Sequence, residues 1–215
     1  MSLERLAAMR QAYEEGGLDE ADLADTWLVQ FGRWLGDAEA AGLVEANAMI
    51  VSTAALGGSP SARTVLLKGV DERGFVFYTG YDSRKGRELE ANPRAALVFP
   101  WHRLRRQVLA SGPVTRVDAA EADAYWASRP HGSKLGALAS PQSEVIASRA
   151  VLEEARAELE RRYPEGSDVP RPERWGGFRV EPESVEFWQG RPDRLHDRLR
   201  FRRDGAAWVV ERLAP

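Results

Sequence analysis

The chain has 215 residues, and its 30 Lys and Arg against 33 Asp and Glu give a formal net charge of −3 at pH 7. It has no cysteine and only three histidines, which excludes disulfides, thiolate metal sites and a cysteine nucleophile, and we expect no bound metal. The near-neutral charge argues against binding nucleic acid over the whole surface. No apolar run is long enough to span a membrane and the first residues are charged, so we expect a soluble cytoplasmic protein.

The first half of the chain mixes helical and strand patterns. Apolar residues at helical spacing predict helices over 3–15 and 27–42. Apolar, β-branched runs predict strands over 48–55, 62–70 and 75–79, and the turn at 71–74 joins the last two in a β-hairpin. Ser83 is the expected N-cap of a helix over 83–91, which Pro93 terminates.

The second half predicts further strands around a helical segment. Strands are expected over 95–101 and 107–117, followed by helices over 118–128, 133–139 and 149–163. Asp118 caps the first of these helices. Three strands near 177–188, 195–203 and 206–212 end the chain, and the last two form a hairpin.

These elements predict a mostly β fold with peripheral helices (α+β), in which an antiparallel sheet forms a small closed or split β-barrel. We expect a single domain over 1–215, with N-terminal helices over about 1–45 and helical insertions over about 118–163. The motifs GxGxxG, GxxxxGK[ST], GxSxG and HExxH are all absent from the sequence. Their absence removes the main support for Rossmann, P-loop, α/β-hydrolase and zincin functions.

A first candidate site follows from the register of the 62–79 hairpin. If its turn centres between Glu72 and Arg73, Arg63 lies opposite Asp82, beside the start of the helix at Ser83. Arg63, Arg84 and Lys85 would then converge on a helix N-terminus, where cations oppose the helix dipole unless an anion binds. We therefore predict a phosphate pocket, the alternative being that Arg84 and Lys85 are simply exposed in the first helical turn.

Strand parity indicates a second anionic group. Arg63 and Lys68 are five residues apart, so on one regular strand they face opposite sides and should not serve the same phosphate. Tyr125, Arg129 and Ser133 are spaced i, i+4 and i+8, and their donors suit a phosphate monoester. An ordinary helix end, with Tyr125 in the core, explains this second cluster equally well.

A third cluster lies in the sequence WQGRPDRLHDR (188–198). If this stretch is a strand, Arg194, His196 and Arg198 point to one face, where they would meet an anionic or electron-rich group. A solvated Arg-rich edge strand and a nucleic-acid contact are the alternatives, and the interleaved acidic residues disfavour the latter.

Many short segments, taken in order, resemble one family. They are RTVLLK (63–68), FVFYT (75–79), SRK (83–85), FPW (99–101), RRQV (105–108), SRP (128–130), PQS (141–143), WGGFR (175–179), EFWQG (186–190), RLHDR (194–198) and RLAP (212–215). Together they resemble pyridoxamine 5′-phosphate oxidase over essentially the whole chain. The resemblance departs from the family pattern at Lys134 and Leu138, where Gln and Trp are usual.

The resemblance implies an FMN-dependent homodimer with a split β-barrel fold and active sites at the subunit interface. It implies oxidation of pyridoxamine or pyridoxine 5′-phosphate to pyridoxal 5′-phosphate, with O2 reduced to H2O2, in vitamin B6 biosynthesis or salvage. The alternatives are another FMN- or deazaflavin-binding split-barrel reductase, or a non-catalytic carrier of pyridoxal phosphate or flavin.

The resemblance also implies roles for individual residues. The family's FMN contacts fall on Arg63, Thr64, Val65, Leu66, Leu67, Lys68, Tyr78, Thr79, Arg84, Lys85, Gln107, Gln142, Ser143, Trp188 and Arg198. Its substrate contacts fall on Lys68, Tyr125, Arg129, Ser133, Arg194, Leu195, His196, Arg10 and Tyr13. Among these, Arg194 and His196 fall at the substrate ring and the reacting carbon, which makes them the expected catalytic residues.

Overall fold

The computed structural model describes residues 17–215, so the expected helix over 3–15 lies outside the described residues. The chain divides into two compact units. The first contains the residues up to 50 together with 96–111 and 182–215, and the second contains 51–95 and 112–181. Three strands contribute residues to both units, namely β1 (Ala48–Ala54), β5 (Arg94–Trp101) and β6 (Arg106–Arg116).

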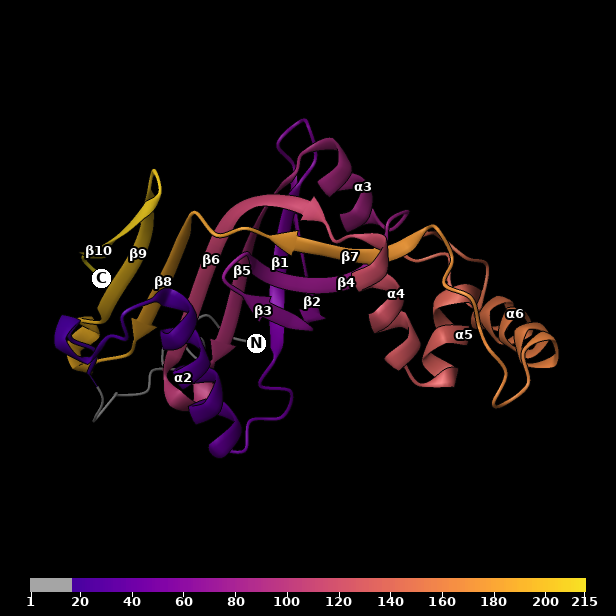
Figure 1. Ribbon diagram of the computed structural model, residues 1–215, viewed down its shortest axis with the longest axis horizontal. Coiled ribbons are helices and arrows are strands. Elements are labelled where there is room, and N and C mark those ends of the chain that lie inside the picture. The colour runs from indigo at the N-terminus through magenta and orange to yellow at the C-terminus, as the bar shows by residue number, and fades with distance from the viewer. Residues whose placement is uncertain (1–16) are drawn as a thin grey trace, which may run out of the picture. The chain divides into compact units, whose positions relative to one another are not determined.

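The first unit is an antiparallel sheet with one long helix, α2 (Trp27–Ala40), packed on it (Figure 1). Its strands follow the order β10-β9-β8-β6-β5-β1. They include β8 (Ser184–Gln189), β9 (Asp197–Asp204) and β10 (Ala207–Arg212). Short 3-10 turns cover η1 (Glu20–Asp22), η2 (His102–Leu104) and η3 (Pro192–Arg194).

Aromatic side chains hold α2 on this sheet. The helix begins at Thr26, whose side chain accepts a hydrogen bond from the Val29 N–H, and its apolar residues recur at helical spacing. The Phe31 ring meets the Phe99 ring at 4.9 Å, and Trp34 meets Phe187 at 5.2 Å. Both phenylalanines on the sheet are fully buried. The core of the first unit therefore lies between α2 and the strands.

The second unit contains the remaining strands and four helices. Here β2 (Pro60–Leu66) pairs with β1, and the strand order β3-β4-β7-β6 links β3 (Gly69–Asp71), β4 (Gly74–Gly80) and β7 (Trp175–Val180) to the end of β6. The helices are α3 (Arg84–Ala91), α4 (Ala119–Ser128), α5 (His131–Ala139) and α6 (Arg149–Arg162). The last two pack side by side (Figure 1).

The predicted hairpin register is correct at the turn and wrong beyond it. Gly69 pairs with Val76 and Val70 with Phe75, which is the predicted pairing. The expected strand over 62–70, however, divides into β2 and β3. Because β2 pairs with β1 across the short turn at 55–59, Arg63 does not pair with β4 and is not opposite Asp82, which follows the end of β4. The expected strand over 177–188 also divides, into β7 and β8, around Pro182, which has no N–H to donate to a sheet.

The other predicted elements are confirmed within a few residues, and so is the fold class, a mostly antiparallel β fold with peripheral helices. Ser83 and Asp118 cap their helices as expected, each accepting a hydrogen bond from a backbone N–H three residues later. Among residues 17–215, none of the helices combines the length and hydrophobicity that a bilayer span requires.

Truncation of Phe187 tests the core of the first unit. Its ring is fully buried and packs edge-on against Trp34 and Phe201. Phe187→Ala should lower the free energy of unfolding by about 3–5 kcal/mol, because the lost contacts leave a cavity. Urea unfolding followed by tryptophan fluorescence measures the change. The control is Val44→Ala, at a side chain that is 92% exposed, and equal stability of the two variants would contradict the assignment.

Candidate functional site

The N-terminus of α3 lies at one end of a cavity in the second unit. The Ser83 hydroxyl accepts a hydrogen bond from the Gly86 N–H at 3.2 Å, which starts the helix. Gly86 has to be glycine, because a Cβ atom there would lie 2.2 Å from the Tyr81 carbonyl oxygen. This close approach brings the positively polarised end of the helix against the end of β4.

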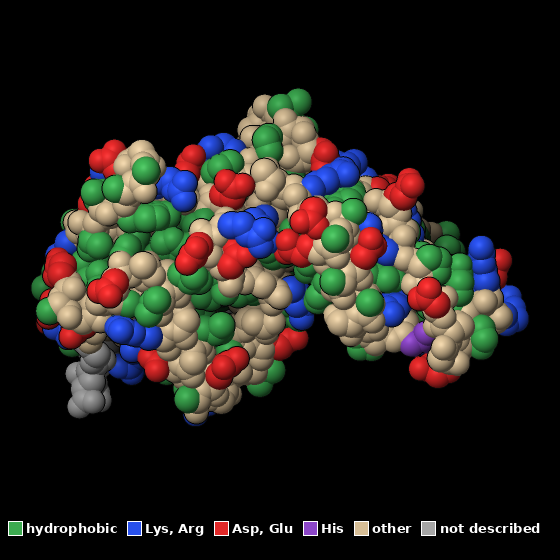
Figure 2. Space-filling view, viewed as in Figure 1, with side chains coloured by type: hydrophobic (Ala, Val, Ile, Leu, Met, Phe, Trp, Pro, Cys, Tyr) green, Lys and Arg blue, Asp and Glu red, His purple; other side chains and the backbone are tan. Residues whose placement is uncertain are grey.

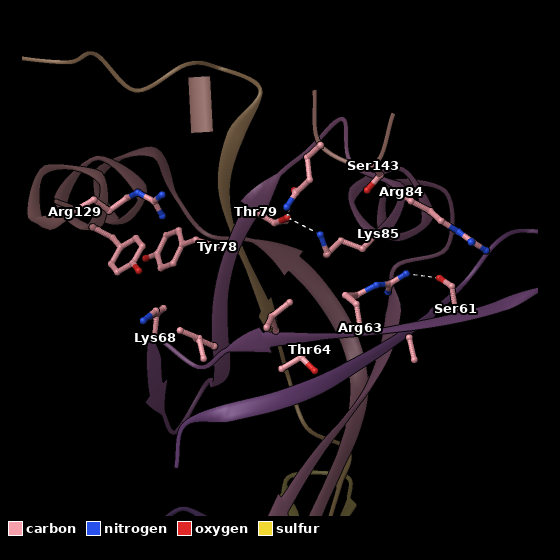
Figure 3. Close-up of a pocket in the computed structure, with 15 residues that line it drawn as sticks. Ser61, Arg63, Thr64, Lys68, Tyr78, Thr79, Arg84, Lys85, Arg129 and Ser143 are labelled. Atoms are coloured by element: carbon pink, nitrogen blue, oxygen red, sulfur yellow. Dashed lines mark hydrogen bonds between the residues drawn. The ribbon is translucent and has the colours of Figure 1, made fainter. Parts of the chain in front are cut away.

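The cavity has a volume of about 590 Å³ and gathers most of the predicted FMN and substrate residues of this unit. Its walls come from β2, β4, the start of α3, the end of α4 and the loop after α5 (Figure 3). The lining residues are Ser61, Ala62, Arg63, Thr64, Val65, Leu66, Lys68, Tyr78, Thr79, Arg84, Lys85, Tyr125, Arg129, Gln142 and Ser143. The three cations predicted to meet at the helix N-terminus therefore line one cavity.

Lys85 is a buried cation in this wall. Its side chain is 6% exposed, and its ammonium donates to the Thr79 hydroxyl at 3.0 Å and the Ser83 hydroxyl at 3.5 Å. No carboxylate among residues 17–215 forms an ion pair with it. Burial, assisted by the nearby charge of Arg63, lowers the pKa of Lys85 to about 8. An anion in the cavity would supply the missing partner.

The two arginines at this end are held by Glu88, which is 7% exposed. Its carboxylate accepts from Arg84 Nε at 2.9 Å and from the Ser61 hydroxyl at 2.5 Å, and it also accepts from the Thr53 hydroxyl. Arg63 donates to the same two hydroxyls, and its Nη1 lies 2.6 Å from Thr53 Oγ1. Burial alone would raise the pKa of Glu88, but these hydrogen bonds outweigh it and lower the pKa to about 2.

A second group of polar side chains lies on the other side of the cavity. In Figure 3, Lys68, Tyr78 and Arg129 are on one side of the view, and Arg63, Arg84 and Lys85 are on the other. The premise that Arg63 and Lys68 share one regular strand is wrong, because β2 ends at Leu66. Both side chains consequently line the same cavity, from different sides.

Stacked aromatic rings support this second side. Tyr78 stacks on Tyr125 at 3.9 Å and on Trp175 at 5.5 Å. Burial, reinforced by Glu121 and Tyr125, raises the pKa of Tyr78 to about 12, so its phenol stays protonated and can donate. Arg129 lies over the Trp175 ring at 4.8 Å, and burial lowers the pKa of its guanidinium.

Arg129 has a buried donor atom without a partner. Its Nη2 donates to the Ser133 carbonyl oxygen at 2.8 Å, whereas its Nε is buried and has no hydrogen-bond partner in the described part of the chain. Ser133 does not line the main cavity but an adjoining one of about 320 Å³, which Arg129 also lines. Arg129 thus connects the two cavities, and its free donor marks a place where a polar ligand would be bound.

The loop after α5 closes the edge of the main cavity. Gln142 Oε1 accepts from the Thr79 hydroxyl at 2.8 Å and from the Gly80 N–H at 3.2 Å, which ties the loop to β4. The next residue, Ser143, has a left-handed backbone with φ 75°, an uncommon conformation for a residue other than glycine. Both residues are predicted FMN contacts, and both line the cavity.

Other predicted residues gather in the first unit. Gln107, Trp188 and Arg198 are direct neighbours across β6, β8 and β9. The His196 ring packs on Trp188 at 4.6 Å, and its Nδ1 accepts from the Arg191 N–H at 3.0 Å. Arg198 pairs with the Glu186 carboxylate at 2.7 Å. The structure therefore brings these four predicted residues together on one part of the sheet.

The expectation that Arg194, His196 and Arg198 alternate along one strand is wrong. Strand β9 begins only at Asp197, and Arg194 lies in the turn η3 with φ 64°. Pro192 interrupts the stretch and lacks the N–H that a continuous strand would need there. Arg194 and Leu195 are exposed, the latter by 71%.

The remaining predicted residues are Arg10, Tyr13 and Leu67. Arg10 and Tyr13 fall outside the described residues. Leu67 is buried and does not line the cavity.

Several residues around the cavity were not predicted from the sequence. Glu88 could have been noticed from its i, i+4 spacing to Arg84. Thr53 and Ser61 gave no signal, since their role depends on the pairing of β1 with β2. Arg174 was also missed, and it donates to the Leu138 carbonyl oxygen at 2.8 Å at the end of α5.

Comparisons with known proteins all indicate the same family. Residues 35–163 match the family described as pyridoxamine 5′-phosphate oxidase, and residues 175–215 match the pyridoxine 5′-phosphate oxidase C-terminal dimerisation region. The pyridoxine/pyridoxamine 5′-phosphate oxidase of Frankia alni is 57% identical, covering 97% of this chain and 88% of the relative. The protein of that name from Rubrobacter xylanophilus is also 57% identical, with 98% and 96% covered.

Solved structures show the same fold. PhzG from Burkholderia lata, solved with tetrahydrophenazine-1-carboxylic acid, superposes with a TM-score of 0.85 at 35% identity, covering 91% of this chain and 95% of that chain. A pyridoxamine 5′-phosphate oxidase-related, FMN-binding protein from Nostoc punctiforme has a TM-score of 0.71 at 20% identity, with 90% and 99% covered. These neighbours confirm the predicted split-barrel type of fold.

Lys85 provides a direct test of anion binding in the cavity. The chain has only three lysines, Lys68, Lys85 and Lys134, so their side-chain NMR signals can be resolved. In chloride buffer, the signal that Lys85→Met removes should titrate near pH 8. Saturating sulfate should raise this pKa, because a bound anion favours the charged ammonium. An unchanged titration of Lys85 in sulfate would contradict an anion site at this end of the cavity.

Proposed function

We propose that this chain, which belongs to the pyridoxamine 5′-phosphate oxidase family, oxidises pyridoxamine or pyridoxine 5′-phosphate to pyridoxal 5′-phosphate, with FMN as its cofactor and O2 as the acceptor that becomes H2O2. Such a reaction would contribute to vitamin B6 biosynthesis or salvage. The observation that supports this proposal best is the single cavity with cationic side chains on both sides.

The end of the cavity at α3 fits the phosphate of FMN. It combines a helix N-terminus with Arg63, Arg84 and the buried, carboxylate-free Lys85, a donor set that matches a dianionic phosphate monoester. Thr64, Val65, Leu66, Thr79, Gln142 and Ser143 would line the rest of the flavin. When bound, FMN supplies the acceptor for the hydride that leaves the substrate carbon.

The other side of the cavity fits the phosphate of the substrate. Lys68 would provide a point charge, Tyr125 a phenol donor, and Arg129 its unused Nε–H, with Ser133 in the adjoining cavity. Two phosphates bound at separate places would orient the two ring systems toward one another. Arg194 would contact the substrate ring and His196 the group on the reacting carbon, with Leu195 between them.

We further propose that the chain acts as a homodimer with its active sites at the subunit interface. The match of residues 175–215 to a dimerisation region supports this assembly. Gln107, Trp188 and Arg198, which lie together in the first unit, would then complete the flavin site.

The other candidate functions have less support. A flavin or deazaflavin reductase with an uncharged substrate would not need Lys68 and Arg129 as an anion site. A nucleic-acid contact would need a continuous basic surface patch, whereas acidic and basic side chains intermingle on the face drawn in Figure 2. A non-catalytic carrier of flavin or pyridoxal phosphate would not release peroxide.

Reconstitution with FMN tests the proposed activity. The purified protein should be yellow after dialysis against FMN and removal of the unbound FMN. When pyridoxamine 5′-phosphate is added in air, it should release H2O2 and pyridoxal 5′-phosphate in equal amounts. Unphosphorylated pyridoxamine is the matched control and should react far more slowly, because it leaves the second cationic group without an anion. A protein that binds no FMN, or binds it and forms no aldehyde, would refute the proposal.

Lys68 separates the two phosphate positions. Lys68→Ala should raise the KM for pyridoxamine 5′-phosphate by about 10- to 100-fold. This is the loss of affinity expected when one hydrogen bond between charged groups is removed. It should weaken FMN binding much less, as measured by flavin fluorescence quenching. Lys134→Ala is the matched control, because Lys134 donates to the Ala127 carbonyl oxygen and does not line the cavity. A larger effect on FMN than on substrate would reverse the assignment of the two ends.

A further inference from the structure

We propose that Glu88 is a positioning residue that orients Arg63 and Arg84 toward the flavin phosphate and so determines how strongly the site prefers FMN over unphosphorylated riboflavin. This inference rests on the proposed FMN function. It concerns a carboxylate that lies behind the cationic wall and that has no place among the residues assigned above to either ligand.

Each oxygen of the Glu88 carboxylate holds a different arginine. Oε1 accepts from Arg84 Nε, four residues earlier on the same helix, at 2.9 Å. Oε2 lies 3.4 Å from Arg63 Nη2 and accepts hydrogen bonds from the Ser61 and Thr53 hydroxyls. The guanidinium of Arg63 donates to these same hydroxyls. Two strands and one helix are thus joined at a single carboxylate.

This arrangement matters differently for the two arginines. Arg63 is already held from several directions, since it also donates to the Val51 carbonyl oxygen. The Arg84 side chain is 58% exposed, and Glu88 is its one hydrogen-bond and ion-pair partner among residues 17–215. Without the carboxylate, Arg84 would be free to adopt many rotamers in solvent, and binding phosphate would require it to lose that freedom again.

The carboxylate also adjusts the charge of the site. Arg63, Arg84 and Lys85 carry three positive charges, and Glu88 leaves two of them uncompensated, which matches the charge of a phosphate monoester above its second pKa of about 6. Glu88 is ionised throughout the neutral range, because the hydrogen bonds it accepts hold its pKa at about 2. A neutral side chain at this position would increase the attraction for an anion while releasing the arginines, so the two effects oppose each other.

Glutamine is the informative replacement. Glu88→Gln keeps the size of the side chain, but it removes the negative charge and replaces one carboxylate oxygen with an NH2 group. If that group faces Arg84, two donors meet. If it faces Ser61 and Thr53, their hydroxyls must accept from it while they also accept from Arg63, and they no longer donate to a carboxylate. We therefore expect the loss of positioning to outweigh the gain in charge.

The experiment compares two flavins in the full-length protein. Dissociation constants of FMN and riboflavin are measured by fluorescence quenching for the wild type, Glu88→Gln and the matched control Glu90→Gln. Glu90 is on the same helix, but it pairs with Arg116 and does not line the cavity. In Glu88→Gln, the Kd of FMN should rise by about tenfold or more, while that of riboflavin changes by less than about twofold. The control should leave both unchanged.

Each other outcome identifies what is wrong. Equal weakening of both flavins would mean that Glu88 only supports the fold, and unchanged or tighter FMN binding would mean that it does not position the arginines; either result overturns the inference. Failure of the wild type to bind FMN would instead refute the proposed function. If Glu88→Gln does not fold, as judged by circular dichroism, Thr53→Val decides, and it should weaken FMN alone by a few-fold.

Discussion

The arrangement of the second unit depends on three cations that meet at a helix N-terminus with a single carboxylate among them. Lys85 is almost completely buried, and within residues 17–215 it donates only to hydroxyls, so its charge is disfavoured without a bound anion. Replacing it with an apolar residue would remove this penalty. The penalty therefore indicates a binding site, because the same burial strengthens the attraction between the ammonium and a phosphate.

The strands determine where each cation can reach. Because β2 pairs with β1, Arg63 meets Thr53 and Glu88, and these contacts direct it to the start of α3. The interruption after Leu66 then allows Lys68 to approach the aromatic side of the cavity. A continuous strand would have directed these two side chains to opposite faces. The break in the strand thus brings Arg63 and Lys68 to the same cavity, as the proposed binding of two anionic groups requires.

Local signals in the sequence predicted much of this structure. The cap at Ser83, the turn at 71–74 and the pair of cations at the start of α3, Arg84 and Lys85, all involve neighbours in the chain. The pairing of β2 with β1 is not encoded in the local sequence, so the strand partner of Arg63 was predicted wrongly. The prediction that Arg63 lies with Arg84 and Lys85 was nevertheless correct. The i, i+4 spacing of Glu88 to Arg84 was a local signal, but the contacts of Glu88 to Thr53 and Ser61 could not be predicted, since they exist only after β1 and β2 have paired.

Five residues other than glycine have positive φ angles among residues 17–215, and two of them, Ser143 and Arg194, have predicted ligand contacts. Ser143 and Arg194 have φ values of 75° and 64°, a conformation that costs a residue other than glycine roughly 1 kcal/mol or more. Glycine would adopt it freely at either place. Glycine, however, would remove a hydroxyl from the cavity wall in one case and an exposed guanidinium in the other. The strain at these positions is explained if the two side chains contact ligands, which is the role that the family resemblance implies for both.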